Sequence, residues 1–227
     1  MQYRIYQVDL DRDDKRVAFE GLELLEKFQG SKDVDASIYD LVYSGVTDGS
    51  SNLNALDSLY QTFNINHPAD YFFRSMSVSD VIEIANPNGS EFFFCDNFGF
   101  ERISFDAAKA RNLFMHTVRG VVCKPGMRAV LADVPLEDEL LRRIIGKDIK
   151  TYNPYHDGTV IVYNDAAKLR GWPVSREVRS PLDESVLYDT IAGQFVILGL
   201  AGDGSFRSLT DDEEKTYMER FAAPYQN

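Results

Sequence analysis

Hydrophobic positions are grouped most clearly between Ser75 and Phe100, where two apolar runs flank a turn. The first run, VSDVIEI (78–84), contains four β-branched residues. It is interrupted by NPNG (86–89), and the run FFFC (92–95) follows. Two apolar runs around a turn of Pro, Asn and Gly predict a β-hairpin. Because the second run shows no polar alternation, we expect its strand to be buried on both faces, in the middle of a sheet.

The rest of the N-terminal half mixes strand and helix patterns. Apolar residues at 19, 22, 25 and 28 have helical spacing and end before Gly30, which predicts an amphipathic helix over 17–29. A second helical stripe runs from Leu53 to Phe63. Shorter runs predict strands at 3–8, 38–43 and 102–105. The segment DAAKARNLFMH (106–116) is rich in helix formers, so we expect a helix there that bridges the two halves.

The C-terminal half contains a second set of strands and helices. Apolar runs predict strands at 127–132, 149–152, 159–163 and 194–200. Pro135 is followed by three acidic residues, and Arg142 and Arg143 precede Gly146, which is the charge order that a helix dipole favours. Thr210 and Glu213 have the spacing of a capping box and predict a last helix over 211–221.

These patterns predict an α+β protein of two small domains, each a mostly antiparallel sheet with one or two packed helices. The strongest turn signal near the midpoint is Lys124-Pro125-Gly126. We therefore expect a first domain at 1–115, a linker at 116–126 and a second domain at 127–227.

The net charge of −12 is unevenly distributed. Residues 1–115 hold 19 acidic and 10 basic residues, whereas the remaining residues hold 17 acidic and 14 basic ones. An acidic field repels nucleic acid and attracts basic surfaces, including the DNA-binding clefts of nucleases. An acidic surface that only keeps the protein in solution is the alternative. Since there is neither a membrane-spanning apolar run nor a signal peptide, we expect a cytoplasmic protein that binds no membrane and no nucleic acid.

Motifs for catalysis or metal binding are weak. The three histidines, at 67, 116 and 156, lack the spacing of a zinc site. The acidic run from Asp9 to Asp14 lacks the glycine and glutamate of a calcium loop. Cys95 and Cys123 have no CxxC spacing and predict two reduced thiols. We therefore expect no catalytic residue, no metal and no cofactor.

A glycine-rich segment and the single tryptophan are also candidate functional features. The glycines at 199, 202 and 204 follow an apolar strand, but the acidic pair Asp211-Asp212 opens the next helix where an anion would bind. They predict a turn. Trp172, the single tryptophan, lies beside Pro173 and fits either a core position or an exposed anchor.

The N-terminal half contains an unusual combination of short motifs. They are YRIYQ (3–7), Leu59-Tyr60 with Phe63-Asn64, Pro68 with Asp70 and Phe72, and SMSVSDVI (75–82) followed by Asp96, Gly99 and Phe100. Over about residues 1–105 this combination resembles the YodL-like domain found in proteins of conjugative elements and phages.

The C-terminal half carries a second, less specific set of marks: Tyr163, Asn164, Lys168, Gly171, Pro173, Arg176, Ile191, Gly193, Phe206, Ser208, Leu209 and Thr210. Over about residues 127–223 it resembles a small family of unknown function that is typical of phages and integrative elements. Neither family brings a catalytic residue set. YodL-like domains are similar to those of large polyvalent proteins that mobile elements use against host defences, so the resemblance implies an anti-defence role by association.

Our first hypothesis is a non-enzymatic anti-defence protein of the anti-restriction or anti-CRISPR type. It would inhibit a host nuclease complex by protein–protein binding, with an acidic surface that mimics DNA. The candidate contact residues lie on the first loop and on the exposed face of the first helix: Asp9, Asp11, Asp13, Asp14, Glu20 and Glu23.

Two other classes stay open. A protein that binds or sequesters a nucleotide signal would use a pocket between the domains, lined by Ser77, Asp80, Asn164 and Arg176. An enzyme acting on a nucleotide or a host protein is the third hypothesis, and it lacks an assembled acid–base or metal constellation. A homodimer with twofold symmetry also stays open.

Overall fold

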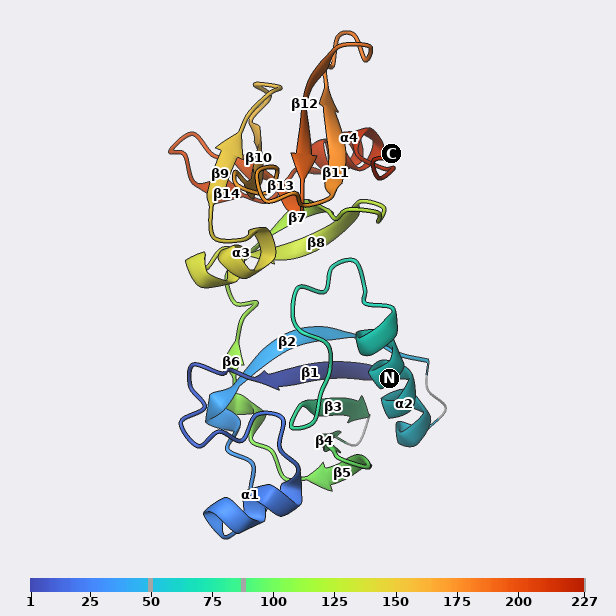
Figure 1. Cartoon of the computed structure of the whole chain (residues 1–227). Coiled ribbons are helices and arrows are strands. Elements are labelled where there is room, and N and C mark those ends of the chain that lie inside the picture. Colours follow the sequence, from blue (N-terminus) through green and yellow to red (C-terminus); the bar gives the residue numbers. More distant parts are fainter. Residues whose placement is uncertain (49–50, 87–88, 227) are drawn as a thin grey trace. The chain divides into compact units, whose positions relative to one another are not determined.

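The computed structural model describes residues 1–48, 51–86 and 89–226 and divides the chain into two compact units, Met1–Leu113 and Phe114–Asn227 (Figure 1). Each unit contains a mostly antiparallel sheet with packed helices, so the α+β class is confirmed. The linker expected at 116–126 is wrong. Thr117–Cys123 is a strand (β7) paired on both sides within the second unit, so the chain passes from one unit to the other without a linker of that length.

The first unit is built on a six-stranded sheet with the order β5-β4-β3-β1-β2-β6. All its neighbours are antiparallel except β2 and β6. The strands are β1 Gln2–Val8, β2 Tyr39–Val46, β3 Val81–Asn86, β4 Gly89–Asp96, β5 Gly99–Ile103 and β6 Arg111–Asn112. The helices are α1 Leu22–Gln29 and α2 Asn52–Ile65, with the short 3-10 segments η1 Ala36–Ile38 and η2 Ala107–Lys109.

The hairpin predicted between Ser75 and Phe100 is present as β3 and β4. Strand β4 lies between β3 and β5, and Phe94 is fully buried. Residues 87 and 88 of the predicted turn lie outside the described residues. The placement of β4 inside the sheet therefore explains the apolar run without alternation.

Strand β1 contributes to a core on each face of this sheet. The ring of Tyr3 lies 6.2 Å from that of Phe63 in α2. The ring of Tyr6 lies 5.2 Å from that of Phe105, in a cluster that includes Leu25 of α1. The two helices thus pack against opposite faces, because successive side chains of a strand point to opposite sides.

The first helix begins at Leu22, later than the pattern predicts. Phe19 has a φ of +68°, which interrupts any helix that starts at residue 17. The helix start packs closely on the turn after β4, since a Cβ on Gly21 would lie 2.4 Å from Asp96 Oδ1. Phe19 and Phe28, which we expected in the buried stripe, are 48% and 70% exposed. Contacts distant in sequence thus shorten the helix and leave two aromatic rings at the surface.

The helix predicted over 106–116 is wrong. Its first part is the single 3-10 turn η2, and Arg111 then enters β6 beside β2. The Arg111 guanidinium donates to Asp40 at 2.9 Å and to Asp9 at 3.0 Å. Helix propensities differ by less than about 1 kcal/mol per residue. An ion pair with two buried carboxylates outweighs that preference.

The second unit contains a sheet with the order β8-β7-β13-β10-β9, to which β14 adds by pairing with β13. Its strands are β7 Thr117–Cys123, β8 Val130–Pro135, β9 Ile149–Tyr152, β10 Thr159–Asn164, β13 Phe195–Leu200 and β14 Phe206–Arg207. A separate two-stranded ribbon is formed by β11 Val174–Arg179 and β12 Leu187–Ala192. The helices are α3 Asp138–Ile145 and α4 Asp211–Arg220.

Helix α4 closes the core of the second unit. Its N-terminus has the predicted capping box, in which Thr210 accepts from the backbone of Glu213 and the Glu213 side chain accepts from the backbone of Thr210. Tyr217 and Phe221 pack with Phe195 of β13 in the main core cluster. Helix α3 contacts β8, β10 and β13.

The ribbon of β11 and β12 has no counterpart in the sequence-based prediction. Its buried positions include the consecutive residues Ser175 and Arg176, which are 0% and 2% exposed and lie at an irregularity in the strand register. A polar residue and a charged residue at buried positions hide the alternation by which a strand is recognised.

Candidate functional site

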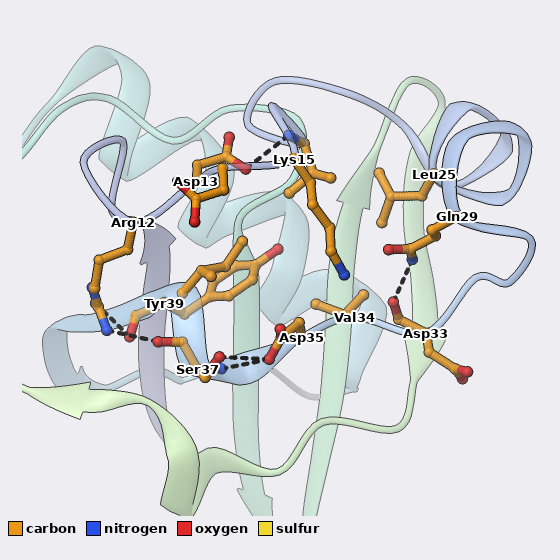
Figure 2. Close-up of a pocket in the computed structure, with 13 residues that line it drawn as sticks. Arg12, Asp13, Lys15, Leu25, Gln29, Asp33, Val34, Asp35, Ser37 and Tyr39 are labelled. Carbon is orange, nitrogen blue, oxygen red and sulfur yellow. Dashed lines mark hydrogen bonds between the residues drawn. The ribbon is translucent and has the colours of Figure 1, made fainter.

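A cavity of about 340 Å³ lies in the first unit between α1, the loop after β1 and the η1 segment (Figure 2). We call it the α1 pocket. Its buried and half-buried apolar lining consists of Val17, Leu25, Val34, Ile38 and Tyr39. Its ionisable lining consists of Arg12, Asp13, Asp14, Lys15, Asp33 and Asp35. Four carboxylates and two cations above an apolar base suit a cationic group carried on an aliphatic stem.

Asp13 holds the loop that forms one wall of the α1 pocket. Its carboxylate accepts hydrogen bonds from the backbone N–H groups of Val17 and Ala18, both at 2.9 Å. Among the described residues, the side chains of Asp14 and Asp33 take part in no hydrogen bond or ion pair, and both are exposed. These two carboxylates are therefore the ones available to a partner.

The opposite wall is formed by η1. The Asp35 carboxylate accepts from the backbone N–H of Ser37 at 3.1 Å and from its hydroxyl at 2.7 Å. These hydrogen bonds, with a smaller effect from nearby Lys15 and Lys109, lower the pKa of Asp35 below its ordinary value. Figure 2 shows the Lys15 side chain extending across the pocket toward Val34. Asp35 is thus ionised at neutral pH.

Asp9, which we expected on the contact surface, is 5% exposed. Its carboxylate accepts from Arg12 at 2.9 Å and from Arg111 at 3.0 Å, and the same two arginines also pair with Asp40. Burial acts to raise the pKa of Asp9, but Arg12, the backbone N–H of Asp11 and Arg111 outweigh it and lower the pKa. Asp9 is therefore a buried ion-pair residue, and its place among the contact residues is corrected.

The other predicted contact residues differ in their exposure and in the cavity that they line. Asp11, Asp14 and Glu23 are exposed, whereas Asp13 and Glu20 are half-buried. The structure brings Asp13 and Asp14 to the α1 pocket. Glu23 lines a second cavity, described next, and Asp11 and Glu20 line neither.

A second cavity, of about 400 Å³, lies between α1 and β5. Its acidic lining residues are Glu23, Asp33, Asp96 and Glu101, and its basic ones are Lys32 and Arg102. Asp33 lines both cavities, so they are neighbours along α1. We define the α1 surface by the exposed carboxylates of the two cavities and by Phe28, which belongs to α1, is 70% exposed and lines neither cavity. The carboxylates are those of Asp14, Glu23, Asp33, Asp35 and Glu101. Aromatic residues such as phenylalanine are enriched in the core of protein-binding surfaces.

The negative charge of the first unit lies at its surface. Four carboxylates are 5% exposed or less, and each is paired with arginine: Asp9 and Asp40 with Arg12 and Arg111, Asp80 with Arg74, and Glu83 with Arg4. Of the 19 acidic and 10 basic residues, removing these four of each kind leaves 15 acidic and 6 basic ones. The net −9 of the unit is therefore carried by groups outside the buried pairs.

The SVSD motif has a structural role around Asp80. Asp80 is fully buried, and its carboxylate accepts from Arg74, from Gln7 Nε2 at 3.0 Å and from the backbone N–H of Ser77 at 2.9 Å. Burial raises the pKa of Asp80 to about 6, partly offset by Arg74. At neutral pH it is ionised and paired. The proposed pocket role of Asp80 has no support in these contacts, because its carboxylate is already bound within the first unit, in part by the backbone N–H of Ser77.

Asn164 and Arg176, the other two proposed pocket residues, are both 2% exposed in the second unit. Asn164 Oδ1 accepts from the backbone N–H of Ala166 at 2.9 Å, and its Nδ2 lies against Gly146, where a Cβ would come within 2.3 Å. Arg176 donates to four backbone carbonyls. Arg176 lines a cavity of the second unit whose lining includes none of the other three predicted pocket residues.

Trp172 is 37% exposed, between the two alternatives that the sequence left open. Its ring covers Gly193 and Gly146, where added Cβ atoms would lie 2.6 and 3.2 Å from ring carbons. Trp172 therefore packs on two glycines and is also partly exposed to solvent.

Glu83 offers a test of the buried ion pairs. Its 3%-exposed carboxylate accepts from Tyr6 at 2.7 Å, from Arg4 and from Ser90. Burial acts to raise the pKa of Glu83, but Ser90, Tyr6 and Arg4 outweigh it, so the folded pKa lies below the ordinary 4.5. Its stabilising contribution is therefore present above pH 4.5 and lost as pH falls through the folded pKa.

We expect Glu83→Gln to lower the free energy of unfolding by about 2 kcal/mol at pH 7. The difference in free energy of unfolding between wild type and variant becomes smaller below pH 4.5. Urea unfolding followed by far-ultraviolet circular dichroism at pH 7 and at several acidic values measures it. A gap that does not change with pH contradicts the assignment.

The two cysteines lie in the cores of the two units. Cys95 and Cys123 are free and buried, and burial raises the pKa of each thiol to about 12. Both are protonated at neutral pH and unsuited to nucleophilic attack. Within residues 1–48, 51–86 and 89–226, no three His, Cys, Asp or Glu are grouped to hold a metal ion. None of the described helices has the length and apolar character to cross a membrane.

Sequence reasoning missed Asp33, Asp35 and Phe28 as members of the site. The two aspartates follow α1 and return to the loop after β1 only through the fold, so no local spacing links them to Asp14. Phe28 stands at a helical position that predicts burial, yet it is 70% exposed. The cluster KDVDAS (32–37), acidic and next to a helix end, is the signal that was present.

Two α+β units of this size, each with its own sheet and core, make this a two-domain protein with an acidic surface on the first domain. Comparison with family models gives the assignment: residues 2–105 are a YodL-like domain and residues 118–222 are a domain of unknown function, DUF3846. The two domains follow one another in the order that the sequence motifs predicted. Searches of curated proteins and of solved structures found no match.

Proposed function

We propose that the protein is an anti-defence inhibitor of a mobile element or phage, acting in the cytoplasm of a bacterial host. It binds a nuclease complex of the restriction or CRISPR type and is not an enzyme. The α1 surface is the contact, and it occupies a basic cleft that otherwise holds DNA. No cofactor or metal is needed, because the effect is steric and electrostatic.

The observation that carries this proposal is the pairing of free carboxylates with an exposed aromatic ring. Asp14 and Asp33 are exposed, and their side chains form no hydrogen bond or ion pair among the described residues. Phe28 of α1, the helix that borders the pocket, is 70% exposed. Carboxylates give long-range attraction to a basic cleft, while a desolvated aromatic ring contributes binding energy at short range. A surface that only maintained solubility would need the charges and not the ring.

Charge complementarity also predicts how binding responds to salt. Exposed charges are screened over about 8 Å at physiological ionic strength, so association slows as salt rises. Excess DNA competes for the same cleft. Inhibition by the acidic surface therefore weakens with added salt and with added DNA.

We expect the double variant Asp14→Asn, Asp33→Asn to inhibit cleavage about tenfold less well than wild type, because each lost charge contact at a cleft costs about 1 kcal/mol or less. The assay is DNA cleavage by a panel of purified restriction and Cas9-type nucleases, at low and high salt, over a range of inhibitor concentrations. Phe28→Ala tests the aromatic contact in the same assay.

The matched control is Asp48→Asn, Asp57→Asn. It makes the same change in net charge at two exposed positions that line neither cavity. If both double variants lose inhibition equally, the loss is due to the change in net charge, and the α1 surface is not the contact. Absence of inhibition by wild type across the panel removes the proposal for those nucleases.

A further inference from the structure

The second unit contains a cavity of about 330 Å³ between β11 and the chain segment that follows α4. That segment runs beside β11, since the backbone N–H of Tyr225 donates to the carbonyl of Ser175 at 2.9 Å. The charged residues of the lining are Arg176, Glu177, Arg179 and Arg220, and its aromatic residues are Phe221 and Tyr225. Three arginines against one glutamate give this cavity a positive charge within a chain of net charge −12.

The positive charge is not cancelled by internal ion pairs. Arg179 is paired with Glu177 at 2.6 Å. Neither Arg176 nor Arg220 has a carboxylate partner among the residues that the structure describes. Among the described residues, two guanidinium groups of the cavity lining therefore carry a positive charge that no carboxylate balances.

Arg176 is the unusual one of the two. It is 2% exposed, and it donates to the carbonyls of Phe221 at 2.9 Å and Met127 at 2.6 Å, as well as to Ser175 and Lys124. Carbonyl dipoles fix the guanidinium but leave its full charge, and arginine does not lose its proton in proteins. A buried charge is ordinarily paired with an opposite one. An anion in the cavity supplies that partner.

Arg220 is exposed and held by aromatic rings. Its guanidinium carbon lies 4.1 Å from the centre of the Tyr155 ring and 5.3 Å from that of Tyr217. Stacking on a ring orders the side chain while leaving the edge of the guanidinium free to donate. Planar donors of this kind match the oxygens of phosphate.

We propose that this cavity binds a small phosphate-bearing ligand of nucleotide size. The volume lies at the lower end of the range of small-molecule sites. Arg220 and the charge of Arg176 attract the phosphate, and Tyr225 provides an aromatic wall for a planar group. This site is separate from the α1 surface and does not depend on the anti-defence proposal.

Isothermal titration calorimetry of the full chain against AMP, inorganic phosphate and adenosine tests the site. We expect AMP to bind, phosphate to bind more weakly and adenosine to bind most weakly. Arg220→Gln weakens AMP binding about tenfold, as the loss of one charge-assisted hydrogen bond predicts. Arg143→Gln, in an exposed helix pair away from the cavity, leaves it unchanged.

Glu177→Gln gives a readout that a purely structural role would not produce. It removes the one carboxylate of the lining and releases Arg179, so we expect AMP and phosphate to bind severalfold more tightly. No heat with any probe at millimolar concentration overturns the proposal. Equal affinities of the Arg220→Gln and Arg143→Gln variants, or weaker binding by Glu177→Gln, also overturn it.

Discussion

Replacing Arg176 by methionine is expected to lower the free energy of unfolding of the second unit by about 4 kcal/mol or more. The side chain donates to the carbonyls of Lys124, Met127, Ser175 and Phe221. A buried polar group left without a partner costs about 1–3 kcal/mol, and methionine offers no donor. These contacts join the β7–β8 turn, the ribbon and the end of α4, so one substitution loosens three segments.

Tryptophan fluorescence reports the unfolding of the second unit. Trp172 is the single tryptophan and lies in the second unit, against Gly146 and Gly193. We expect its urea transition to move to lower concentration in Arg176→Met. The urea transition of Arg176→Lys should lie between those of wild type and Arg176→Met. An ammonium keeps the charge, but it lacks the forked donors with which arginine reaches four carbonyls. The matched control, Arg143→Met, changes an exposed helix pair and should move the transition little.

A methionine variant as stable as wild type would show that these carbonyls find other partners. That outcome would remove the structural role assigned to Arg176. It would leave the phosphate-site proposal to its own test, since that test uses Arg220 and Glu177.

Replacing Phe94 by alanine is the second change with a large expected effect. Phe94 is fully buried in β4, in the cluster with Tyr6, Tyr39 and Phe105. Truncating a buried phenylalanine costs about 3–5 kcal/mol, from lost transfer energy and the cavity left behind. That is a large part of the stability of a domain of this size.

Phe98 supplies the control for this experiment. It lies four residues further along the same chain segment and is 98% exposed, so Phe98→Ala should change stability by no more than about 0.5 kcal/mol. Hydrogen exchange measured by mass spectrometry on peptides covering β3 to β5 reports the first unit directly. Similar exchange in the two variants would contradict the placement of Phe94 in the core.

Local signals in the sequence predicted much of the fold. The β3–β4 hairpin and the capping box at Thr210 depend on neighbouring residues, and both are present. The start of α1 and the helix expected at 106–116 were wrong, because each is decided by a distant partner. Gly21 packs against Asp96, and Arg111 binds Asp9 and Asp40. Contacts between residues so far apart in sequence cannot be recognised from the spacing of hydrophobic residues along the chain.

The candidate site shows the same division. The acidic loop was recognised from charge density, and Asp14 and Glu23 are exposed as a contact surface requires. Asp9 was misplaced, since one of its two arginines comes from a strand about a hundred residues away. Asp33 and Asp35 were missed because only the fold brings them to the α1 pocket.

Ser79 links the SVSD motif to the α1 pocket. Its backbone has a φ of +77°, its hydroxyl accepts from the backbone of Phe19 at 2.9 Å, and its carbonyl accepts from the hydroxyl of Tyr39, in the pocket wall, at 2.8 Å. In a deep mutational scan scored by the proposed inhibition, substitutions at Ser79 and Asp80 would therefore score as severely as those at the proposed contact positions. A parallel scan scored by cellular abundance separates the two groups, because motif variants lose abundance while Asp14 and Asp33 variants keep it.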